Sequence, residues 1–134
     1  MNIHLIAIGG SVMHNLALAL KTNGHDVSGS DDEIYDPARS RLSSKGILPQ
    51  KMGWDSSRIS KSIDAVIVGK HARSDNPELL EAKRLDLKIY SFPSFGAEMS
   101  KEKKRIVIAG SHGKTSTTSI VMHVAKECAI DFDY

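Results

Sequence analysis

The fold is decided by residues 3–31, which read IHLIAIGGSVMHNLALALKTNGHDVSGSD. The stretch opens with a continuous apolar run, 3–8, which ends at the glycine pair 9–10 and is typical of a buried strand. Apolar residues then recur at helical spacing up to the Asn-Gly pair 23–24, and 26–30 indicates a second strand. A strand, a glycine turn, a helix and a further strand make the right-handed β-α-β unit of a parallel sheet.

The rest of the chain continues this alternation. Asn76 can cap a helix whose first residue is Pro77, and this helix should run to about Leu85. Further expected elements are a helix over 37–44 stopped by Gly46, a short strand at 47–48, strands over 65–68, 88–90 and 106–109, and a turn and helix over 92–100. We therefore expect an α/β fold, a Rossmann-like parallel sheet with helices on both faces.

A second glycine turn, residues 109–116, reads AGSHGKTS and lies between the expected strand 106–109 and a helix that opens at Thr115. This order is typical of a phosphate-binding loop, because its two glycines let backbone N–H groups turn toward a polyphosphate at the positive end of the helix. Lys114 supplies a mobile cation and Thr115 a hydroxyl for Mg²⁺. The full phosphate-loop consensus would have a glycine at position 108, where this chain has Ile.

The position of this loop indicates two domains. A nucleoside triphosphatase needs several strands after its phosphate loop, whereas this loop lies close to the last residue of the sequence. We therefore expect the front part of a longer enzyme, with a complete domain over 1–103. Residues 104–134 would hold the first strand, the phosphate loop and the helix of a truncated ATPase domain. The charge run 101–105, KEKKR, suits a solvated link between the domains better than an anion-binding patch.

Composition and charge restrict the class of partner. The chain of 134 residues is 40% hydrophobic and 25% charged, as in an ordinary globular protein, and its net charge is +2. This balance provides no basic footprint for nucleic acid. The first twenty residues lack a basic start, and no run of about eighteen apolar residues occurs, so we expect a cytoplasmic protein without membrane insertion. The one cysteine, Cys128, fits a reducing compartment.

The first glycine turn lies where a Rossmann sheet binds a pyrophosphate, but its spacing is incomplete. Val12 and Asn15 occupy places where further glycines of the dinucleotide fingerprint could stand. Asp31, about twenty residues beyond Gly10, ends the second strand, where a carboxylate can accept from ribose hydroxyls. A tight turn without a ligand and a solvated acidic loop over 31–33 are the structural alternatives.

Two of the six histidines stand where a ligand would bind. His112 lies in the second glycine turn, and His71 follows the strand 65–68 at an edge of the sheet where ligands gather. The other histidines are expected to be ordinary core or surface residues, and no metal-ligand spacing links any of the six. Trp54, the one tryptophan, is expected to bury its ring in the first domain, with base stacking as the alternative.

Four segments together resemble one family. They are the first strand and turn over 3–13, the segment 24–31 (GHDVSGSD), the segment 75–78 (DNPE) and the phosphate loop 109–116. This set is similar to the N-terminal part of the Mur ligases that act on UDP-N-acetylmuramate, and the similarity spans nearly the whole chain. Two subgroups share these motifs. One comprises the L-alanine ligases of peptidoglycan synthesis, and the other the ligases that reattach L-alanyl-γ-D-glutamyl-meso-diaminopimelate during cell-wall recycling.

The first glycine turn resembles the recycling enzymes slightly more. The alanine ligases usually carry Gly-x-Gly-Gly-x-Gly-Met, whereas Ala7 and Val12 replace the first and last of these glycines here. The segments 11–13 (SVM) and 30–37 (SDDEIYDP) are closer to those of the recycling ligases. The residues at 14–15, His-Asn, stand where relatives often have small side chains.

The resemblance implies two nucleotide sites. The UDP-sugar would be bound by Gly9, Gly10, Ser11, Val12 and Met13 at its diphosphate, by Asp31 at the uridine or its ribose, and by His71 and Ser74 at the neighbouring part. ATP would be held by Gly110, His112, Gly113, Lys114, Thr115 and Ser116, with Lys114 as the catalytic residue and Thr115 as the Mg²⁺ ligand.

The resemblance also implies a reaction, the ATP-dependent joining of L-alanine or the tripeptide to UDP-N-acetylmuramate through an acyl phosphate. Family members have a UDP-sugar domain, a central ATPase domain and a C-terminal domain that brings the amino substrate. The present chain corresponds to the first of these and the start of the second, so alone it should be inactive as a ligase. The rival interpretations are a stand-alone Rossmann nucleotide sensor of the NAD type, and a P-loop kinase or GTPase, although the latter usually begins with its phosphate-loop strand.

Overall fold

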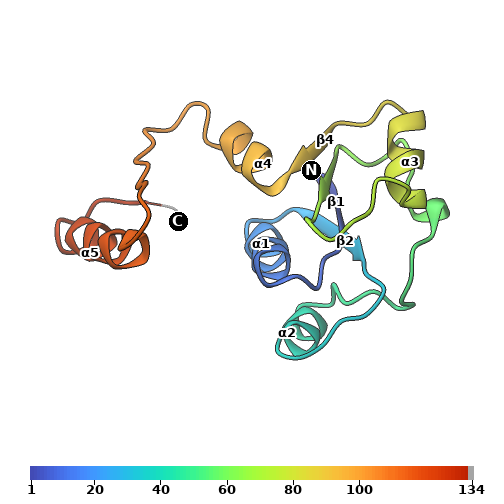
Figure 1. Cartoon of the computed structure of the whole chain (residues 1–134), viewed down its shortest axis with the longest axis horizontal. Coiled ribbons are helices and arrows are strands. Elements are labelled where there is room, and N and C mark those ends of the chain that lie inside the picture. Colours follow the sequence, from blue (N-terminus) through green and yellow to red (C-terminus); the bar gives the residue numbers. More distant parts are fainter. Residues whose placement is uncertain (133–134) are drawn as a thin grey trace. The chain divides into compact units, whose positions relative to one another are not determined.

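The chain consists of two compact units, Met1–Lys101 and Glu102–Tyr134, and the computed structural model describes residues 1–132 of it. The first unit is built on a sheet of four strands, β1 (Asn2–Ile6), β2 (Asp26–Ser30), β3 (Ala65–Val68) and β4 (Ile89–Ser91). Every pairing in this sheet is parallel and the strand order is β2-β1-β3-β4 (Figure 1). The parallel α/β sheet predicted from the sequence is confirmed.

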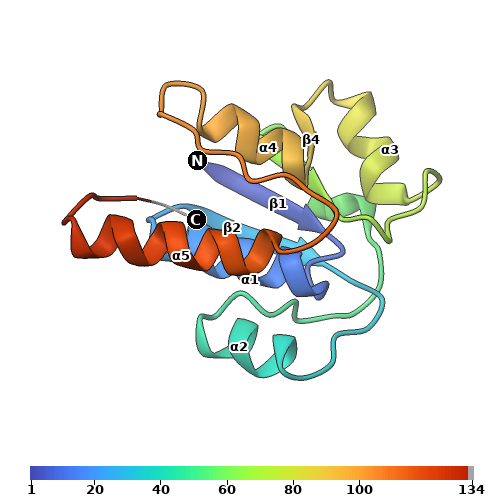
Figure 2. The ribbon, with the colours of Figure 1, turned by 60° about the vertical axis from the view of Figure 1, so that its left-hand side comes forward.

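Helices cover both faces of the sheet, because successive side chains of its buried strands point to opposite sides (Figure 2). Leu5 of β1 belongs to a core shared with α1 (Ser11–Thr22), α2 (Ala38–Ser44) and α4 (Phe92–Met99). Ile6, the next residue, belongs to a core on the opposite face with α3 (Pro77–Arg84), close to the short 3₁₀ turn η1 (Ser56–Arg58). These two cores hold the strand ends, and therefore the loops that follow them, in fixed positions.

The chain after α2 differs from the prediction. Gly46 ends the helix in the left-handed region, with φ of +67°, and the N–H of Ile47 returns to the carbonyl of Leu42 at 3.0 Å. The predicted strand at 47–48 is wrong. Ile47 is apolar because its side chain, 5% exposed, fills the core beside α2 and not because it pairs with another strand.

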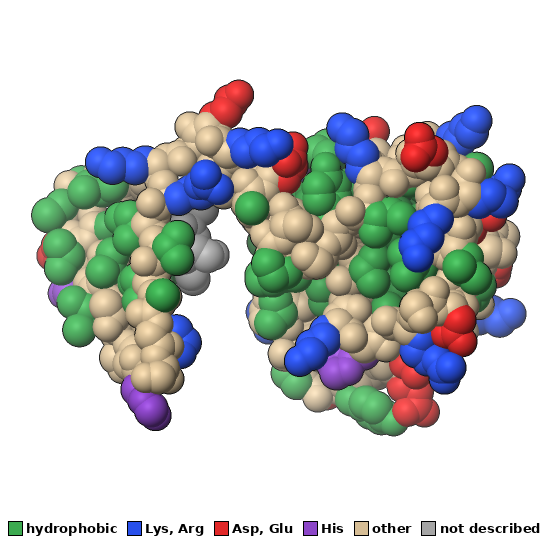
Figure 3. Space-filling model, turned by 45° about the horizontal axis from the view of Figure 1, so that its top comes forward, with side chains coloured by type: hydrophobic (Ala, Val, Ile, Leu, Met, Phe, Trp, Pro, Cys, Tyr) green, Lys and Arg blue, Asp and Glu red, His purple; other side chains and the backbone are tan. Residues whose placement is uncertain are grey.

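The second unit holds a single helix within its described residues, α5 (Lys114–Glu127), which begins one residue before the predicted position. The predicted strand over 106–109 is wrong, since Ile106 and Val107 are 72% and 84% exposed and form no strand. A strand requires a neighbour with which it exchanges backbone hydrogen bonds, and the described part of this unit offers none. The structure therefore has a glycine loop and a helix here, with hydrophobic side chains on the surface of the unit (Figure 3).

None of the helices described between residues 1 and 132 has both the length and the apolar character that crossing a membrane requires.

Candidate functional site

The loops that follow the strands meet at one edge of the sheet in the first unit. The chain passes from β1 to β2 on one side of β1 and later crosses to β3 on the other side, so its direction of winding changes between β1 and β3. In open parallel sheets, ligands bind in the crevice outside the carboxyl ends of the strands at this point. The predicted site residues 9–13, Asp31 and His71 all follow strands that end at this edge.

The first turn of α1 presents backbone N–H groups that no side chain caps. Gly10 is the N-cap residue, and the first turn contains no acidic residue. Two other helices of this unit, α3 and α4, are instead capped by the side chains of Asn76 and Ser91. The first N–H groups of a helix have no partner within it, and the helix dipole makes this end positive. The start of α1 is therefore suited to an anion such as a phosphate.

Asp31 follows β2 and supports this turn. Its carboxylate is 7% exposed and accepts the N–H of Gly9 at 2.7 Å and that of Asp32 at 3.0 Å. Burial, reinforced by the neighbouring Asp32 carboxyl, raises the pKa of Asp31 to about 6. Asp31, predicted to meet the uridine or its ribose, is thus engaged with the backbone of the turn, and the exposed carboxylate is that of Asp32.

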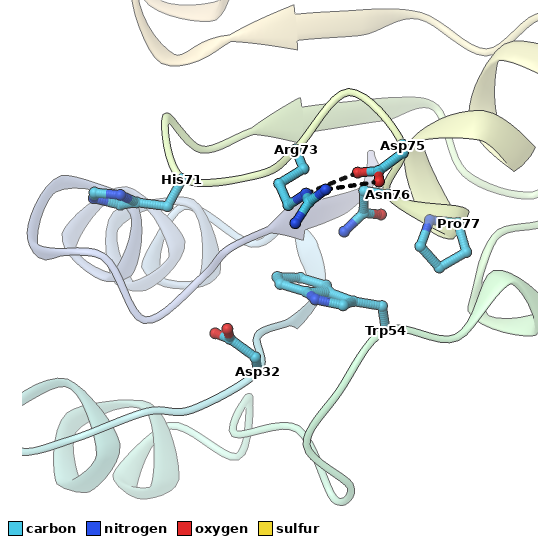
Figure 4. Close-up of a pocket in the computed structure, with 7 residues that line it drawn as sticks. All are labelled: Asp32, Trp54, His71, Arg73, Asp75, Asn76 and Pro77. Atoms are coloured by element: carbon cyan, nitrogen blue, oxygen red, sulfur yellow. Dashed lines mark hydrogen bonds and ion pairs between the residues drawn. The ribbon is translucent and has the colours of Figure 1, made fainter.

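A hollow of about 310 Å³ opens at the same edge (Figure 4). It is lined by Asp32 after β2, by His71 and Arg73 after β3, by Trp54, and by Asp75, Asn76 and Pro77 at the start of α3. Figure 4 shows the indole ring of Trp54 projecting between Asp32 on one side and Arg73 and Asn76 on the other. An aromatic face surrounded by a few polar groups suits a planar ligand that also carries hydrogen-bonding atoms.

A second hollow, of about 410 Å³, shares Asp32 with the first and has a more acidic lining. Its walls are Asp32, Glu33, Ile34, Tyr35, Asp36, Arg39 and Met52, and the hydroxyl of Tyr35 donates to the Glu33 carboxylate. Carboxylates repel a phosphate, so this hollow is the poorer place for an anionic ligand.

In the second unit, the loop before α5 keeps one backbone feature of the predicted phosphate loop, a glycine as N-cap of the helix. Gly113 caps the helix in the left-handed region, with φ of +75°, which favours glycine. No side chain caps α5, and its first turn lacks acidic residues. The Lys114 ammonium donates to the carbonyls of Gly110 at 2.6 Å and Ser111 at 3.4 Å, and so closes the loop on itself.

The other predicted ATP ligands lie on the surface of this loop. His112, Thr115 and Ser116 are all exposed, and His112 Nδ1 lies 3.2 Å from the Ser111 hydroxyl. Within residues 1–132, no group of three or more His, Cys, Asp or Glu side chains is arranged to hold a metal ion. A hydroxyl such as that of Thr115 is a hard oxygen ligand, which Mg²⁺ accepts together with the oxygens of a bound nucleotide. The loop therefore fits a magnesium-bound polyphosphate.

Comparison with known proteins identifies the family. The protein-family model described as "Mur ligase family, catalytic domain" matches residues 2–104, well over half of the chain. The chain belongs to the Mur ligase family. The resemblance drawn from the four sequence segments is confirmed.

Two of its curated relatives are UDP-N-acetylmuramate–L-alanine ligases. The enzyme of Carboxydothermus hydrogenoformans is 36% identical over 129 residues, and that of Caldicellulosiruptor saccharolyticus is 40% identical over 128 residues. The matches cover 96% and 95% of the present chain, but only 27% and 28% of the relatives. This Mur ligase chain thus spans little more than a quarter of the length of these enzymes.

Solved structures of both subgroups share the fold. The UDP-N-acetylmuramate–alanine ligase of Thermotoga maritima is 31% identical with a TM-score of 0.74, and the match covers 96% of this chain and 30% of that one. The murein peptide ligase of Psychrobacter arcticus is 30% identical with a TM-score of 0.80, and the match covers 98% of this chain and 27% of that one. The fold is therefore common to Mur ligases that differ in their amino substrate.

The hollow of this Mur ligase contains residues that sequence reasoning missed. His71 was predicted there, but Asp32, Trp54, Arg73 and Asn76 belong to no phosphate-binding motif. Apart from His71, the single tryptophan is the sequence signal for the hollow, with base stacking as the alternative to a buried ring. Ser74, which was predicted, is exposed and does not line this hollow.

Proposed function

We propose that this chain is the UDP-substrate-binding part of a Mur ligase and that residues 1–101 bind UDP-N-acetylmuramate. The observation that carries the proposal is the uncapped start of α1 at the same edge of the sheet as the Trp54 hollow. A UDP-sugar has an anionic diphosphate, which suits the helix start, and a planar uridine, which suits the hollow. Curated relatives that contain the matched segment are named for UDP-N-acetylmuramate.

The diphosphate would meet the backbone at the start of α1. The side chain of Met13 is buried, so this residue would act through its N–H group, together with those of Ser11 and Val12. Gly10, as N-cap, would allow the diphosphate to approach the helix end closely. The N–H of Gly9 already donates to the Asp31 carboxylate, so it would not bind the diphosphate. The role of Gly9 would instead be to keep the turn narrow.

The uridine would lie in the hollow beside the Trp54 ring. His71 lines this hollow, and Ser74 follows it in the same loop, where it would reach the neighbouring part of the substrate. The exposed Asp32 carboxylate is available to ribose hydroxyls, while Asp31 would act by holding the turn. The acidic groups around the second hollow would keep the diphosphate near α1.

ATP and Mg²⁺ would bind the loop of the second unit. Gly110, His112, Gly113, Lys114 and Ser116 would surround the phosphates, and Thr115 would contribute its hydroxyl to Mg²⁺. Bound ATP would supply the phosphoryl group that activates the muramyl carboxylate as an acyl phosphate. The Lys114 ammonium, which donates to two carbonyls of its own loop in this structure, would turn to the phosphates and offset their charge.

The reaction of the full-length enzyme would join an amine to the muramyl carboxylate in peptidoglycan synthesis or recycling. L-Alanine and L-alanyl-γ-D-glutamyl-meso-diaminopimelate both remain candidates for the amine, because similar structures include an alanine ligase and a murein peptide ligase. We place the enzyme in the cytoplasm because its proposed substrates are soluble nucleotides. The chain of 134 residues, lacking most of the length of its relatives, should show no ligase turnover.

Ligand titration separates this function from its rival, an NAD-binding sensor. Trp54 is the one tryptophan of the chain and lines the hollow, so its fluorescence reports directly on occupancy. UDP-N-acetylmuramate is expected to change this fluorescence and to release heat in calorimetry, whereas NAD at the same concentration does neither. Tight binding of NAD without a response to UDP-N-acetylmuramate would reject the proposal in favour of the sensor.

A further inference from the structure

The carboxylate of Glu78 is fully buried and contacts four residues from three separate segments of the first unit. Its Oε2 accepts from His4 Nε2 of β1 at 3.2 Å and from the hydroxyl of Ser30 of β2. Its Oε1 accepts the N–H of Asp55 at 2.9 Å and lies 3.5 Å from the Arg58 guanidinium. Burial acts to raise the pKa of Glu78, but the hydrogen bonds from His4, Ser30 and Asp55 outweigh it and lower that pKa. The group is therefore an anion inside the protein.

Arg58, the ion-pair partner of Glu78, is bonded to the loop that carries Trp54. Its guanidinium donates to the carbonyl of Gly53 at 2.8 Å and to that of Lys51 at 2.7 Å. A planar guanidinium can serve several acceptors at fixed angles, which a lysine ammonium cannot do. The chain over 51–58 is thus wrapped around this side chain.

Both peptide neighbours of Trp54 are held by this one ion pair. The carbonyl of Gly53, before Trp54, is bound by Arg58, and the N–H of Asp55, after Trp54, is bound by Glu78. The N–H of Gly53 also donates to the carbonyl of Asp31 at 2.8 Å. The backbone on each side of the indole is therefore fixed before any ligand arrives, which reduces the ordering cost of binding.

We propose that Glu78 and Arg58 are positioning residues that hold Trp54 in place for the uridine of the substrate and so set the affinity for the UDP-sugar. This inference rests on the proposed function, because it takes the Trp54 hollow as the uridine site. Neither residue lines the hollow, so both would act through the loop 51–58. Glu78 follows Asn76 and Pro77, which do line it, so the start of α3 is held by the same carboxylate.

The test is a double-mutant cycle on the full 134-residue chain, read by calorimetry with UDP-N-acetylmuramate. Arg58→Ala is expected to raise the dissociation constant about tenfold, the loss typical of a charge-assisted hydrogen-bond network. It should also increase acrylamide quenching of Trp54 fluorescence. In a Trp54→Ala background, the same substitution should change the dissociation constant by less than about twofold, because the residue through which it acts is gone.

Arg84→Ala is the matched control, because it removes an arginine from an exposed ion pair with Glu81 on α3. It should change neither the affinity nor the quenching. Equal losses of affinity in both backgrounds would overturn the inference, as would a folded Arg58→Ala with wild-type affinity and quenching. If Arg58→Ala does not fold, Arg58→Lys replaces it in the same comparison, since it keeps a charge beside Glu78 without the planar fork.

The two proposals fail in different ways. If the wild-type chain does not bind UDP-N-acetylmuramate but Arg58→Ala still exposes Trp54 to acrylamide, the proposed function is rejected and the positioning of Trp54 is supported. If quenching is unchanged in the folded variant, the positioning role is rejected whatever the chain binds.

Discussion

The Asp31 carboxylate accepts the N–H of Gly9 at 2.7 Å, and the same oxygen lies 2.9 Å from the place that a Cβ on Gly9 would take. This contact joins the end of β2 to the turn between β1 and α1. It therefore sets the shape of the turn whose N–H groups we propose for the diphosphate. It also links that shape to the protonation of one buried carboxyl.

Gly9→Ala is expected to lower the free energy of unfolding by about 1–3 kcal/mol, because the added methyl would press on Asp31 and Ile34. Gly10→Ala is the matched control. A Cβ there would find its nearest neighbour at 3.6 Å, and the φ of −57° suits alanine, so the change should stay within about 0.5 kcal/mol. Urea denaturation measures both variants, and equal losses would contradict the close contact at Gly9.

Asp31→Asn should remove a pH dependence of stability. The pKa of Asp31 is about 6 in the folded chain against an ordinary 3.8, so between these values the folded state holds a proton that the unfolded state has released. The contribution of Asp31 to the free energy of unfolding is therefore present at low pH and falls by up to about 3 kcal/mol as the pH rises from about 4 to 6. Above this range it stays lost.

The measurement is the difference in unfolding free energy between wild type and Asp31→Asn at several pH values. Titrating groups other than Asp31 and its neighbour Asp32 cancel in this difference, which should shift against the wild type as pH rises toward neutrality. A difference that stays constant over this range, or a carbon-13 titration of the Asp31 carboxyl at its ordinary pKa, would show that burial does not act on this group.

Ala7 adopts the left-handed region, with φ of +64°, although its side chain is buried. Ala7→Gly should change the unfolding free energy by less than about 1 kcal/mol, because relief of backbone strain offsets the lost methyl. Ala7→Val should lower the free energy of unfolding by more than about 2 kcal/mol, since a β-branched side chain tolerates positive φ poorly. Space beside Ala7 is also short, because a Cβ on Gly69 would already lie 3.0 Å from the Cβ of Ala7. Thermal denaturation in which Ala7→Val is more stable than Ala7→Gly would refute this backbone conformation.

Lys114→Ala in the full-length ligase should abolish ATP-dependent acyl-phosphate formation, with a loss of at least about a hundredfold, because the phosphate charge is no longer offset. Binding of UDP-N-acetylmuramate should be unchanged. Lys126→Ala, in the last turn of α5, is the control and should retain activity. Phosphate release and calorimetry give the two readouts, and unchanged turnover in Lys114→Ala would reject the role of this residue.

Elements with local signals could be predicted from the sequence. The apolar runs of β1 and β3, the glycine turn before α1 and the Asn76 cap of α3 each depend on a few adjacent residues, and each is present in the structure. The segment 106–109 has the same apolar signal, but the described residues of its own unit offer no strand to pair with, so it forms none. The pairing of strands depends on residues far away in the sequence, and an apolar run does not reveal whether such a partner exists.

The site was harder to predict because its parts converge from distant segments. In the sequence, Glu78 is an ordinary acid in the first turn of a helix, and Asp31 is an acid at the end of a strand. Their burial follows from residues on other strands and loops, such as His4 for Glu78 and Gly9 for Asp31. Trp54 lies in a loop without motif, and only the fold brings it to the edge where the strands end.

An NMR titration of the nitrogen-15-labelled chain with UDP-N-acetylmuramate tests the central claim most directly. We predict that the backbone amide signals of Ser11, Val12 and Met13 and the indole signal of Trp54 shift together and saturate at one ligand concentration. The loop 110–116 should not respond to this ligand. Saturable binding that leaves the amides at the start of α1 unmoved would contradict the assignment of the diphosphate, and with it the proposed function.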